Sequence, residues 1–380
     1  MTTTLHGSRL ERIRARMSDL GVDALLLSHG ADLPWLTGYR AMPLERLTVL
    51  VLPREGEPVL IVPALEAPRV PDAADGFSVR PWGESEDPVG IAAGLLKMAT
   101  VSGSGSPGTI GISDRSWAVT LLSFQEQFPG TRWLPASRVT APLRAVKDPA
   151  EVAALRAAAR AADQVADALH AGEIPLIGQS EASVSEEISR RLLHAGHTAV
   201  NFAIVASGPN AASPHHEPGE RRIGVGETVV CDFGGALSLD GDVGYCSDIT
   251  RTVVTGPVPD DVADAYAVLT AGHSAGLAAV APGVSAASVD GATREAITQA
   301  GWGQYFIHRT GHGIGIEEHE DPYLVAGNEE PLVPGNAFSI EPGIYVPGRF
   351  GMRLEDIVVL TPSGPEVLNA ADRSLRIVEA

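Results

Sequence analysis

Short apolar runs alternate with amphipathic stretches over about the first 140 residues of the chain. Stretches with helical spacing lie near 8–20 and 92–98. Four apolar runs have the length and the Gly or Pro boundaries of buried strands: 24–27, 47–52, 59–62 and 109–112. Strands separated by helices predict a small α/β domain with a mixed sheet. No group of residues in this half has the composition of a catalytic site.

Longer helices dominate the second half. Asp148-Pro149 followed by Glu151 is a strong helix start, and an Ala-rich amphipathic helix continues from it to about residue 171. Three more helices are expected over about 181–194, 260–280 and 285–300. Strand-like segments are 228–233, 243–254, 337–346 and 352–360. Long helices with hairpin-connected strands predict an α+β fold, and the change of pattern divides the chain into domains 1–143 and 144–380.

Composition narrows the range of partners. The 380-residue chain has a net charge of −19, so it is a poor candidate for binding nucleic acid or an anionic membrane. The most apolar long stretch, 267–284, contains His273 and Pro282 and is typical of a packed helix, not of a membrane span. Only Cys231 and Cys246 are present, which excludes a disulfide framework, and the N-terminus lacks a signal peptide's apolar core. We therefore expect a cytoplasmic protein.

Two aspartates interrupt apolar strands in the second half. Asp232 ends one strand, Asp248 lies within the next, and Asp240-Gly241 between them is a strong hairpin signal. A hairpin centred on residue 240 would place Asp232 opposite Asp248. Facing carboxylates in a half-buried sheet repel each other, and a bound cation would remove that penalty. Taken singly, each aspartate is more readily explained as a turn cap or an arginine partner.

Two glutamates and a histidine join this pair. Glu341 and Glu355 each interrupt an apolar run, and His312 lies in the glycine-rich stretch 311–315, where the backbone can approach closely. Those glycines weakly resemble a phosphate loop, but the acids that follow them would repel phosphate. Four carboxylates balance two divalent cations, and oxygen ligands with one histidine suit Mn(II), Co(II) or Zn(II). Two such ions about 3.5–4 Å apart can generate and position a hydroxide. The predicted ligands are Asp232, Asp248, His312, Glu341 and Glu355.

Five stretches of the second half together form a specific signature: 231–234, 247–252, 308–315, 340–345 and 353–356. They resemble the metal-dependent pita-bread peptidases, the family of Xaa-Pro dipeptidase (prolidase), aminopeptidase P and methionine aminopeptidase. The first half is more loosely similar to the creatinase-type N-terminal domain of prolidase and aminopeptidase P, which methionine aminopeptidases lack. The resemblance implies a creatinase-like domain over 1–143 and a pita-bread catalytic domain over 144–380.

The resemblance also assigns roles by position. The family's dinuclear metal ligands fall on the five residues named above, and Glu341 corresponds to its proton shuttle. The family's substrate-site histidines fall on His215, His308 and His319. His215 and His319 would hydrogen-bond the developing oxyanion or the substrate backbone, and His308 would help to form the proline pocket.

Arg353 and the hairpin between the two aspartates also belong to the predicted site. Arg353 lies two residues before Glu355 and is expected to orient it. The hairpin is longer than is usual in the family, and it adds Asp240 and Asp242 as rival ligands; acids are routine beside a Gly turn, so Asp232 and Asp248 are preferred.

The expected hairpin register also sets Cys231 opposite Ile249 and Cys246 opposite Gly234. Two buried strand thiols are therefore expected. A redox-sensitive thiol at Cys246, two residues from Asp248, is the alternative.

The resemblance thus implies a metallopeptidase that hydrolyses the Xaa-Pro bond at the N-terminus of dipeptides or short peptides, through a hydroxide held by two metal ions. Mn(II) is the expected metal, with Co(II) or Zn(II) as alternatives. The expected partners are a small peptide and a second copy in a homodimer, and the chain length favours dipeptides. Three alternatives remain: a metal-free creatinase-like hydrolase, an inactive scaffold, and a metal-dependent hydrolase of a non-peptide small molecule. The intact acid set argues against the first two.

Overall fold

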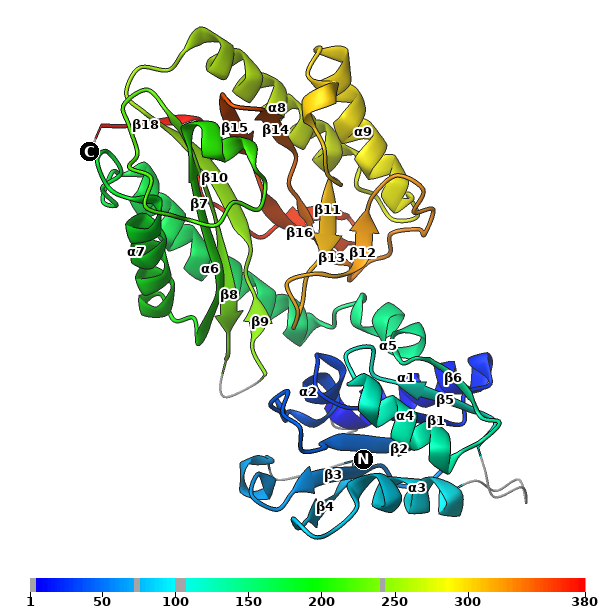
Figure 1. Cartoon of the computed structure of the whole chain (residues 1–380). Helices are drawn as coiled ribbons and strands as arrows, with labels where there is room; N and C mark the ends of the chain where they lie inside the picture. Colours follow the sequence, from blue (N-terminus) through cyan, green and yellow to red (C-terminus); the bar gives the residue numbers. More distant parts are fainter. Residues whose placement is uncertain (1–4, 72–75, 100–106, 240–242, 380) are drawn as a thin grey trace. The chain divides into compact units, whose positions relative to one another are not determined.

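A computed structural model of the chain describes residues 5–71, 76–99, 107–239 and 243–379 (Figure 1). The chain divides between Arg144 and Ala145 into two compact units, here called the N-terminal unit and the C-terminal unit. Across the described ranges, no helix is both long and apolar enough to cross a lipid bilayer.

The N-terminal unit is built on one six-stranded mixed sheet. Its elements are α1 (Leu5–Leu20), β1 (Ala24–Leu27), α2 (Asp32–Thr37), β2 (Val49–Pro53), β3 (Val59–Pro63), the 3-10 helix η1 (Ala67–Arg69), β4 (Ser78–Trp82), α3 (Pro88–Ala99), β5 (Thr109–Ile112), α4 (Ala118–Gln127), β6 (Arg132–Pro135) and α5 (Ser137–Arg144). The strand order is β4-β3-β2-β1-β5-β6, with β2 antiparallel to both neighbours and the other pairs parallel. All four predicted strands are confirmed, whereas the sequence pattern missed β4, β6, α2, α4 and α5.

The core of the N-terminal unit explains why its strands read as continuous apolar runs. Leu96 of α3, Phe124 of α4 and Phe128 just after α4 pack against Leu26 and Ile61 of the sheet, and all five are buried. Every position of β1 and β2 is buried, and strands buried on both faces need apolar residues at every position.

The C-terminal unit alternates long helices with two larger sheets and a small one. Its elements are α6 (Pro149–His170), α7 (Glu181–His194), β7 (Ala199–Ser207), η2 (Gly208–Ala212), β8 (Thr228–Leu237), β9 (Tyr245–Cys246), β10 (Ile249–Thr255), α8 (Asp260–Ala279), α9 (Ala286–Gln299), η3 (Gly303–Tyr305), β11 (Gly311–Gly313), β12 (Glu320–Leu324), β13 (Ala337–Ile340), β14 (Gly343–Val346), β15 (Phe350–Arg353), β16 (Asp356–Thr361), β17 (Gly364–Val367) and β18 (Arg376–Val378). All four predicted helices are confirmed, and α6 begins at the predicted start, where Asp148 and Glu151 form a capping box.

The sheets of the C-terminal unit lie between two pairs of helices (Figure 1). Strands β18-β10-β8-β7 form one sheet with β9 beside β8, strands β12-β11-β13-β16-β17 form another, and β14 pairs with β15. Helices α6 and α7 pack on the first sheet, whereas α8 and α9 pack on the second sheet and on the β14-β15 pair. The helices therefore form the outside of the unit and the sheets form its inside, as expected for the pita-bread fold.

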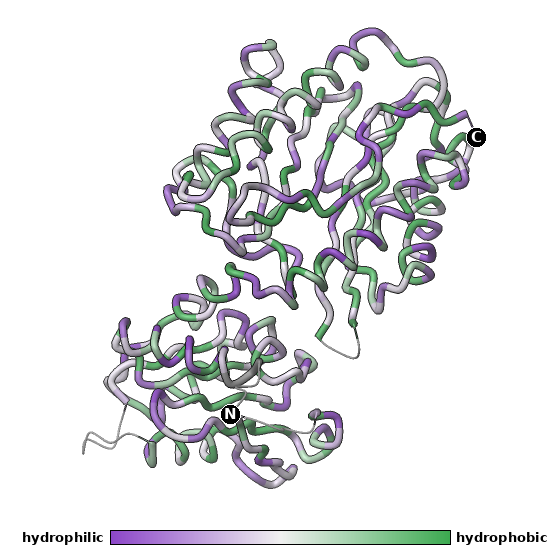
Figure 2. Tube along the Cα trace, turned by 180° about the vertical axis from the view of Figure 1, so that it is seen from behind, coloured by the Kyte–Doolittle hydropathy of each residue, from purple (hydrophilic) through white to green (hydrophobic). Residues whose placement is uncertain are grey.

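The alternation of side chains along β8 determines which of them face each side of the sheet. Cys231 and Phe233 belong to the core formed with α6 and α7, so the side chain between them, Asp232, points to the opposite face of the sheet. Hydrophobic and hydrophilic residues likewise follow one another along the helices (Figure 2). Hydrophobic burial on one face therefore presents a carboxylate on the other.

Three predicted strands of the C-terminal unit are each broken in two. The breaks fall at Asp248, between β9 and β10; at Glu341, between β13 and β14; and at Glu355, between β15 and β16. In the second and third cases the chain leaves one sheet and enters another. The apolar pattern did not reveal these breaks because both halves of each segment are buried.

The predicted hairpin register was wrong by two residues. Asp232 pairs with Thr250, not with Asp248, and the pairs between β8 and β9 follow the same displaced register. Cys231 accordingly pairs with Arg251, and Cys246 pairs with Ala236. A shift of two leaves every side chain on its predicted face. The rival acids Asp240 and Asp242 lie outside the described residues.

Candidate active site

All nine predicted site residues line one cavity of about 490 Å³ in the C-terminal unit. They are Asp232, Asp248, His312, Glu341, Glu355, His215, His308, His319 and Arg353. Five other residues complete the lining: Phe202, Ile204, Pro214, Arg309 and Glu318. The lining therefore combines acids and histidines with a smaller apolar set, Phe202, Ile204 and Pro214, here called the apolar wall.

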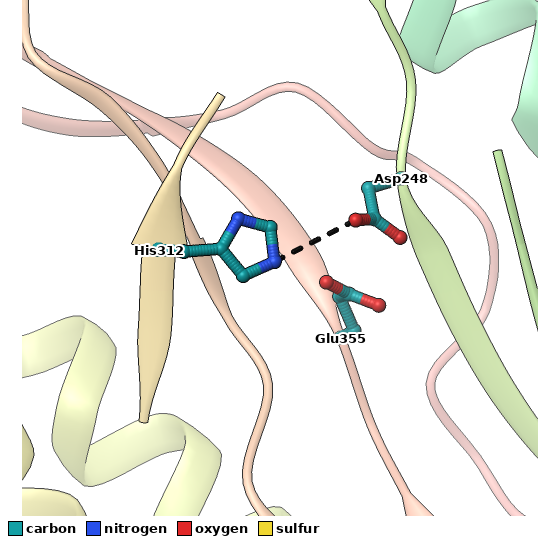
Figure 3. A group of neighbouring side chains, drawn as sticks. All are labelled: Asp248, His312 and Glu355. Atoms are coloured by element: carbon teal, nitrogen blue, oxygen red, sulfur yellow. Dashed lines mark ion pairs between the residues drawn. The ribbon is translucent and has the colours of Figure 1, made fainter. Parts of the chain in front are cut away.

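Three of the five predicted metal ligands converge. Asp248, His312 and Glu355 each offer one ligand atom, and these atoms lie within 4.8 Å of one another (Figure 3). His312 Nε2 is 3.7 Å from Asp248 Oδ2, and the His312 ring comes from β11, on the other sheet. Residues from two sheets thus meet where the strands break.

Buried oxygens without a donor mark the same place. Asp232 Oδ1, Asp248 Oδ1 and Glu355 Oε1 are buried and accept no hydrogen bond. Burial, together with the neighbouring carboxylates, raises the pKa of Asp248 and of Glu355 well above the ordinary range. Desolvation and mutual repulsion both oppose ionisation here, and a cation would relieve both.

Glu341 has a different environment from its neighbours. Its Oε1 lies 3.1 Å from His312 Nε2 and accepts a hydrogen bond from Ser339 Oγ at 3.1 Å. Burial by itself would raise the pKa of Glu341, but His312, His308 and Arg353 outweigh it and hold this pKa at about 2. Glu341 is therefore ionised at neutral pH.

Arg353 is linked to Glu355 through one intervening side chain, that of Thr250. Its Nη2 forms an ion pair with Asp232 Oδ2, and its Nε donates to Thr250 Oγ1 at 3.0 Å. Thr250 Oγ1 in turn donates to Glu355 Oε2 at 2.7 Å, so the link between Arg353 and Glu355 passes through a threonine.

Thr250 and Tyr345 are two supporting residues that the sequence reasoning missed. The Tyr345 hydroxyl accepts from Arg353 Nη1 at 2.7 Å and lies 3.0 Å from His308 Nε2. Both residues lie inside the signature stretches, and Thr250 pairs with Asp232 across β8 and β10. Their polar groups within buried strands were the available signal.

The three histidines predicted to bind substrate differ in their burial and in their contacts. His308 is fixed by Arg309 O at 2.7 Å and by Tyr345, and burial lowers its pKa. The exposed ring of His319 lies 4.0 Å from the ring of His312. His215 is exposed and lines the cavity from the loop after η2.

The apolar wall and one arginine add a second part to the site. Phe202 and Ile204 come from β7, a strand that was not predicted. Arg309 also lines the cavity, and its guanidinium lies 4.5 Å from the centre of the Tyr323 ring. No carboxylate in the described part of the chain forms an ion pair with Arg309.

The two cysteines lie beside this site without entering it. Both are buried free thiols, as expected. Burial raises the pKa of Cys231 to about 12, so its thiolate is suppressed. Cys246 Sγ lies 3.4 Å from the carbonyl oxygen of Ile316. Nothing in these contacts favours the redox alternative.

The donor set fits a divalent metal centre. Asp248 and Glu355 meet one imidazole, and Asp232 in the same cavity also has a carboxylate oxygen that accepts no hydrogen bond. Hard oxygen ligands with a single nitrogen suit Mn(II), Co(II) or Zn(II). Thr250 donates a hydrogen bond to Glu355, and Arg353 forms an ion pair with Asp232. Contacts of this kind commonly orient metal ligands.

Known proteins share the whole architecture. Residues 153–362 match metallopeptidase family M24, and residues 9–146 match the creatinase/prolidase N-terminal domain. The chain is 40% identical over 377 residues to a probable dipeptidase, PepE, of Mycobacterium tuberculosis, covering 98% of this chain and 97% of the relative. It is 34% identical over 381 residues to a Xaa-Pro dipeptidase of Lactobacillus delbrueckii subsp. lactis, covering 97% and 98%. The crystal structure of dipeptidase PepE from Mycobacterium ulcerans matches with a TM-score of 0.91 at 41% identity, covering 100% of both chains. The predicted family resemblance and two-domain fold are confirmed.

Proposed function

We propose, because this chain belongs to metallopeptidase family M24, that it is a Xaa-Pro dipeptidase that works with two divalent metal ions. The observation that carries the proposal is the convergence of Asp248 and Glu355 on His312, together with three buried carboxylate oxygens, of Asp232, Asp248 and Glu355, that accept no hydrogen bond. All of these residues line one cavity of about 490 Å³, which is large enough for a dipeptide. The similarity to a Xaa-Pro dipeptidase over almost the full chain supports the substrate class.

The five predicted ligands would hold the ions. Asp248, His312 and Glu355 already converge, and Asp232 and Glu341 line the same cavity. Four carboxylates balance the charge of two divalent cations, which we expect to be Mn(II). When bound, such ions activate a water molecule and polarise the scissile carbonyl.

Side chains of the protein would transfer the proton and stabilise the negative charge that develops on the carbonyl oxygen. Glu341, ionised at neutral pH, accepts a proton from the attacking water and delivers it to the proline nitrogen as the C–N bond breaks. His215 and His319 donate hydrogen bonds to the oxyanion that forms on the carbonyl oxygen. The products are a free amino acid and proline.

The apolar wall suits the proline ring. Phe202, Ile204 and Pro214 line the same cavity as His308 and offer an apolar surface that needs no N–H donor from the substrate. This matters because an Xaa-Pro bond carries no N–H.

Arg309 would bind the carboxylate of the dipeptide. It reaches the cavity and is free of an acidic partner among the described residues. A charge-assisted hydrogen bond to a carboxylate contributes about 1.5–3 kcal/mol, so its loss should lower kcat/KM at least tenfold.

The test compares kcat/KM for Ala-Pro, Ala-Pro-amide and Ala-Pro-Ala. Ala-Pro should be cleaved at least about tenfold better than the amide, and Arg309→Gln should remove that preference. Arg349→Gln, at an exposed arginine paired with Asp261, is the matched control. Equal or better cleavage of the amide and tripeptide would show that no carboxylate clamp exists and would favour an aminopeptidase P activity.

Metal dependence is tested separately. Dialysis against a chelator should abolish turnover, Mn(II) should restore it, and elemental analysis should find two ions per chain. Full activity in a verified metal-free preparation would contradict the metal mechanism. Including creatine and other small amides in the substrate panel tests the non-peptide alternative.

We also propose a cytoplasmic homodimer. The cavity is lined only by residues of the C-terminal unit among those described, so the N-terminal unit supplies no part of the lining. Light scattering that shows a monomer at micromolar concentration would refute the dimer.

A further inference from the structure

His215 is the site residue with the least visible support. Its ring is exposed to the cavity and makes no hydrogen bond to any residue within the described ranges. His308, by contrast, is held at both ring nitrogens. An oxyanion donor must be held in place before the reaction, so the support for His215 has to come from its chain neighbours.

Both neighbours of His215 are anchored, and in different directions. The carbonyl oxygen of Pro214 accepts a hydrogen bond from Arg353 Nη1 at 3.3 Å. On the other side, His216 Nε2 donates to Glu181 Oε2 at 2.8 Å. The Arg353 contact leads back to the acid cluster, whereas the His216 contact leads to a carboxylate that no step of the mechanism uses.

Glu181 is the centre of a small network at the start of α7. Its side chain is fully buried, with 0% exposure. Oε1 accepts from Ser207 N at 2.8 Å and from Ser207 Oγ at 2.7 Å, and Asn210 Nδ2 donates to both oxygens at 3.1 Å. Three points on the segment 207–216 therefore converge on one carboxylate: the end of β7, the middle of η2, and His216.

The network keeps Glu181 ionised although it is buried. Burial by itself would raise the pKa of Glu181, but the hydrogen bonds from Ser207, His216 and Asn210 lower it below its usual value. The N-terminus of α7, where Glu181 is the first residue, also favours a negative charge. A fully hydrogen-bonded buried carboxylate holds its donors in a narrow range of positions.

We propose that Glu181 is a positioning residue for His215, acting through His216 and Asn210. With Arg353 on the other side, it fixes the loop after η2 so that the His215 ring stays aimed into the cavity. The catalytic part of this inference rests on the proposed function, whereas the tethering of the loop does not. Helix capping cannot explain the contacts, because Ser180 already caps α7 through the backbone N–H of Ser183.

Kinetics of four variants separate positioning from a merely structural role. Glu181→Gln and His216→Ala should each lower kcat about ten- to a hundredfold, with KM within about twofold, because a misplaced oxyanion donor is missed in the transition state. His216→Gln, which keeps a donor near the position of Nε2, should recover most of the lost rate. Glu187→Gln, at a surface carboxylate of the same helix paired with Arg190 and Arg191, should leave the rate unchanged.

A double-mutant comparison then asks whether the effect passes through His215. In the background of His215→Ala, Glu181→Gln should lower kcat by less than about threefold further, since the group that it positions is already gone. Losses that multiply in the double variant would overturn the proposal. So would a fall in melting temperature without a change in kcat in His216→Ala, whose side chain is 21% exposed and tolerant of truncation.

Hydrogen–deuterium exchange provides a test that does not depend on the substrate. Glu181→Gln and His216→Ala should speed exchange in the segment 208–216, whereas the Glu187→Gln control should not. Unchanged exchange there would overturn the tether even if the protein cleaves Ala-Pro. If the wild type fails to cleave Ala-Pro, the proposed function is lost, and the exchange data still decide whether Glu181 holds this loop.

Discussion

The two units of the chain treat acidic side chains differently, although each is built of apolar strands covered by helices. In the N-terminal unit every described Asp and Glu is at least partly exposed; Asp32, for example, pairs with Arg144 at 3.0 Å. In the C-terminal unit many carboxylates are buried: Glu151, Asp163, Glu181, Asp232, Asp248, Asp290, Glu320, Glu355 and Asp356. Burying a carboxylate is costly, so each of these needs a compensating partner.

The buried acids of the C-terminal unit fall into two groups. Protein donors satisfy the first group: Asp356 Oδ1 accepts from Arg251 Nη2 at 2.8 Å, and Asp290 Oδ1 accepts from Thr310 Oγ1 at 2.8 Å. The second group is Asp232, Asp248 and Glu355, each of which keeps one buried oxygen without a donor. Burial of an acid is therefore compatible with a purely structural role, whereas unsatisfied oxygens that converge on an imidazole indicate a metal centre.

Asp248→Asn is the most severe test of this division. Removing one ligand should lower kcat/KM about a thousandfold, because metal-centred charge stabilisation contributes several kcal/mol. The metal-free variant should nevertheless melt about 2–4 °C higher than metal-free wild type, since one repelling, desolvated carboxylate is gone. Differential scanning calorimetry in chelator checks this. A lower melting temperature for the metal-free variant would show that Asp248 stabilises the fold.

Asp356→Asn is the matched change in the satisfied group. Arg251 is completely buried and would lose its ionic partner, so the free energy of unfolding should fall by about 3 kcal/mol or more. Urea unfolding of the metal-free protein measures the change. An unfolding midpoint equal to that of the wild type would contradict the division into two groups.

Local sequence chemistry accounts for much of the fold. The capping box of Asp148 and Glu151 marked the start of α6, and the four short apolar runs of the N-terminal unit are its central strands. These signals act over a few residues, and tertiary packing did not override them. The strand β7 was missed because its first residues, such as Ala199 and Asn201, are exposed and weaken the apolar pattern.

The candidate site was visible from the sequence as residue types but not as geometry. An acid inside an apolar run indicates a buried carboxylate, and Asp232, Asp248, Glu341 and Glu355 all line the cavity. Whether such an acid lies within a strand or at a break depends on which sheet receives the chain next, and a continuous apolar pattern does not encode that. The ion pair of Arg353 with Asp232 joins positions 121 residues apart, a distance at which a single sequence has no local signal.

His170 tests whether one unsatisfied group is enough to mark a site. Both ring nitrogens are buried without a hydrogen-bond partner, and burial, then Arg251, lowers the pKa to about 4. The unfolded chain has a pKa near 6.5, so His170 should reduce stability as the pH falls from 6.5 towards 4. After allowance for solvent screening, the effect should be about 1 kcal/mol, or about 2–4 °C.

The variant His170→Leu should therefore melt higher than wild type at pH 4.5, by an amount that shrinks at pH 7.5. Its kcat/KM should be unchanged, because His170 belongs to no cluster of potential ligands among the residues described. A loss of activity in this variant would mean that an isolated unsatisfied group also contributes to the site.

Arg349 provides the smallest expected effect and the clearest contrast with Arg251. It forms an ion pair with Asp261, but the two side chains are 60% and 41% exposed, so water and salt already solvate both charges. Exposed pairs of this kind contribute about 0.2–1 kcal/mol, and the guanidinium also lies 5.4 Å from the centre of the Phe350 ring, which adds only a few tenths more at an exposed position. Arg349→Ala should thus lower the free energy of unfolding by less than about 1 kcal/mol, and by less still in 0.5 M salt, where the screening length is only a few ångströms.

Urea unfolding of this variant at low and high salt, compared with that of Asp356→Asn, contrasts an exposed arginine–aspartate ion pair with a buried one. A loss at Arg349 as large as the loss at Asp356 would show that burial does not decide what a charge contributes in this unit, and the division of its acids would have to be abandoned.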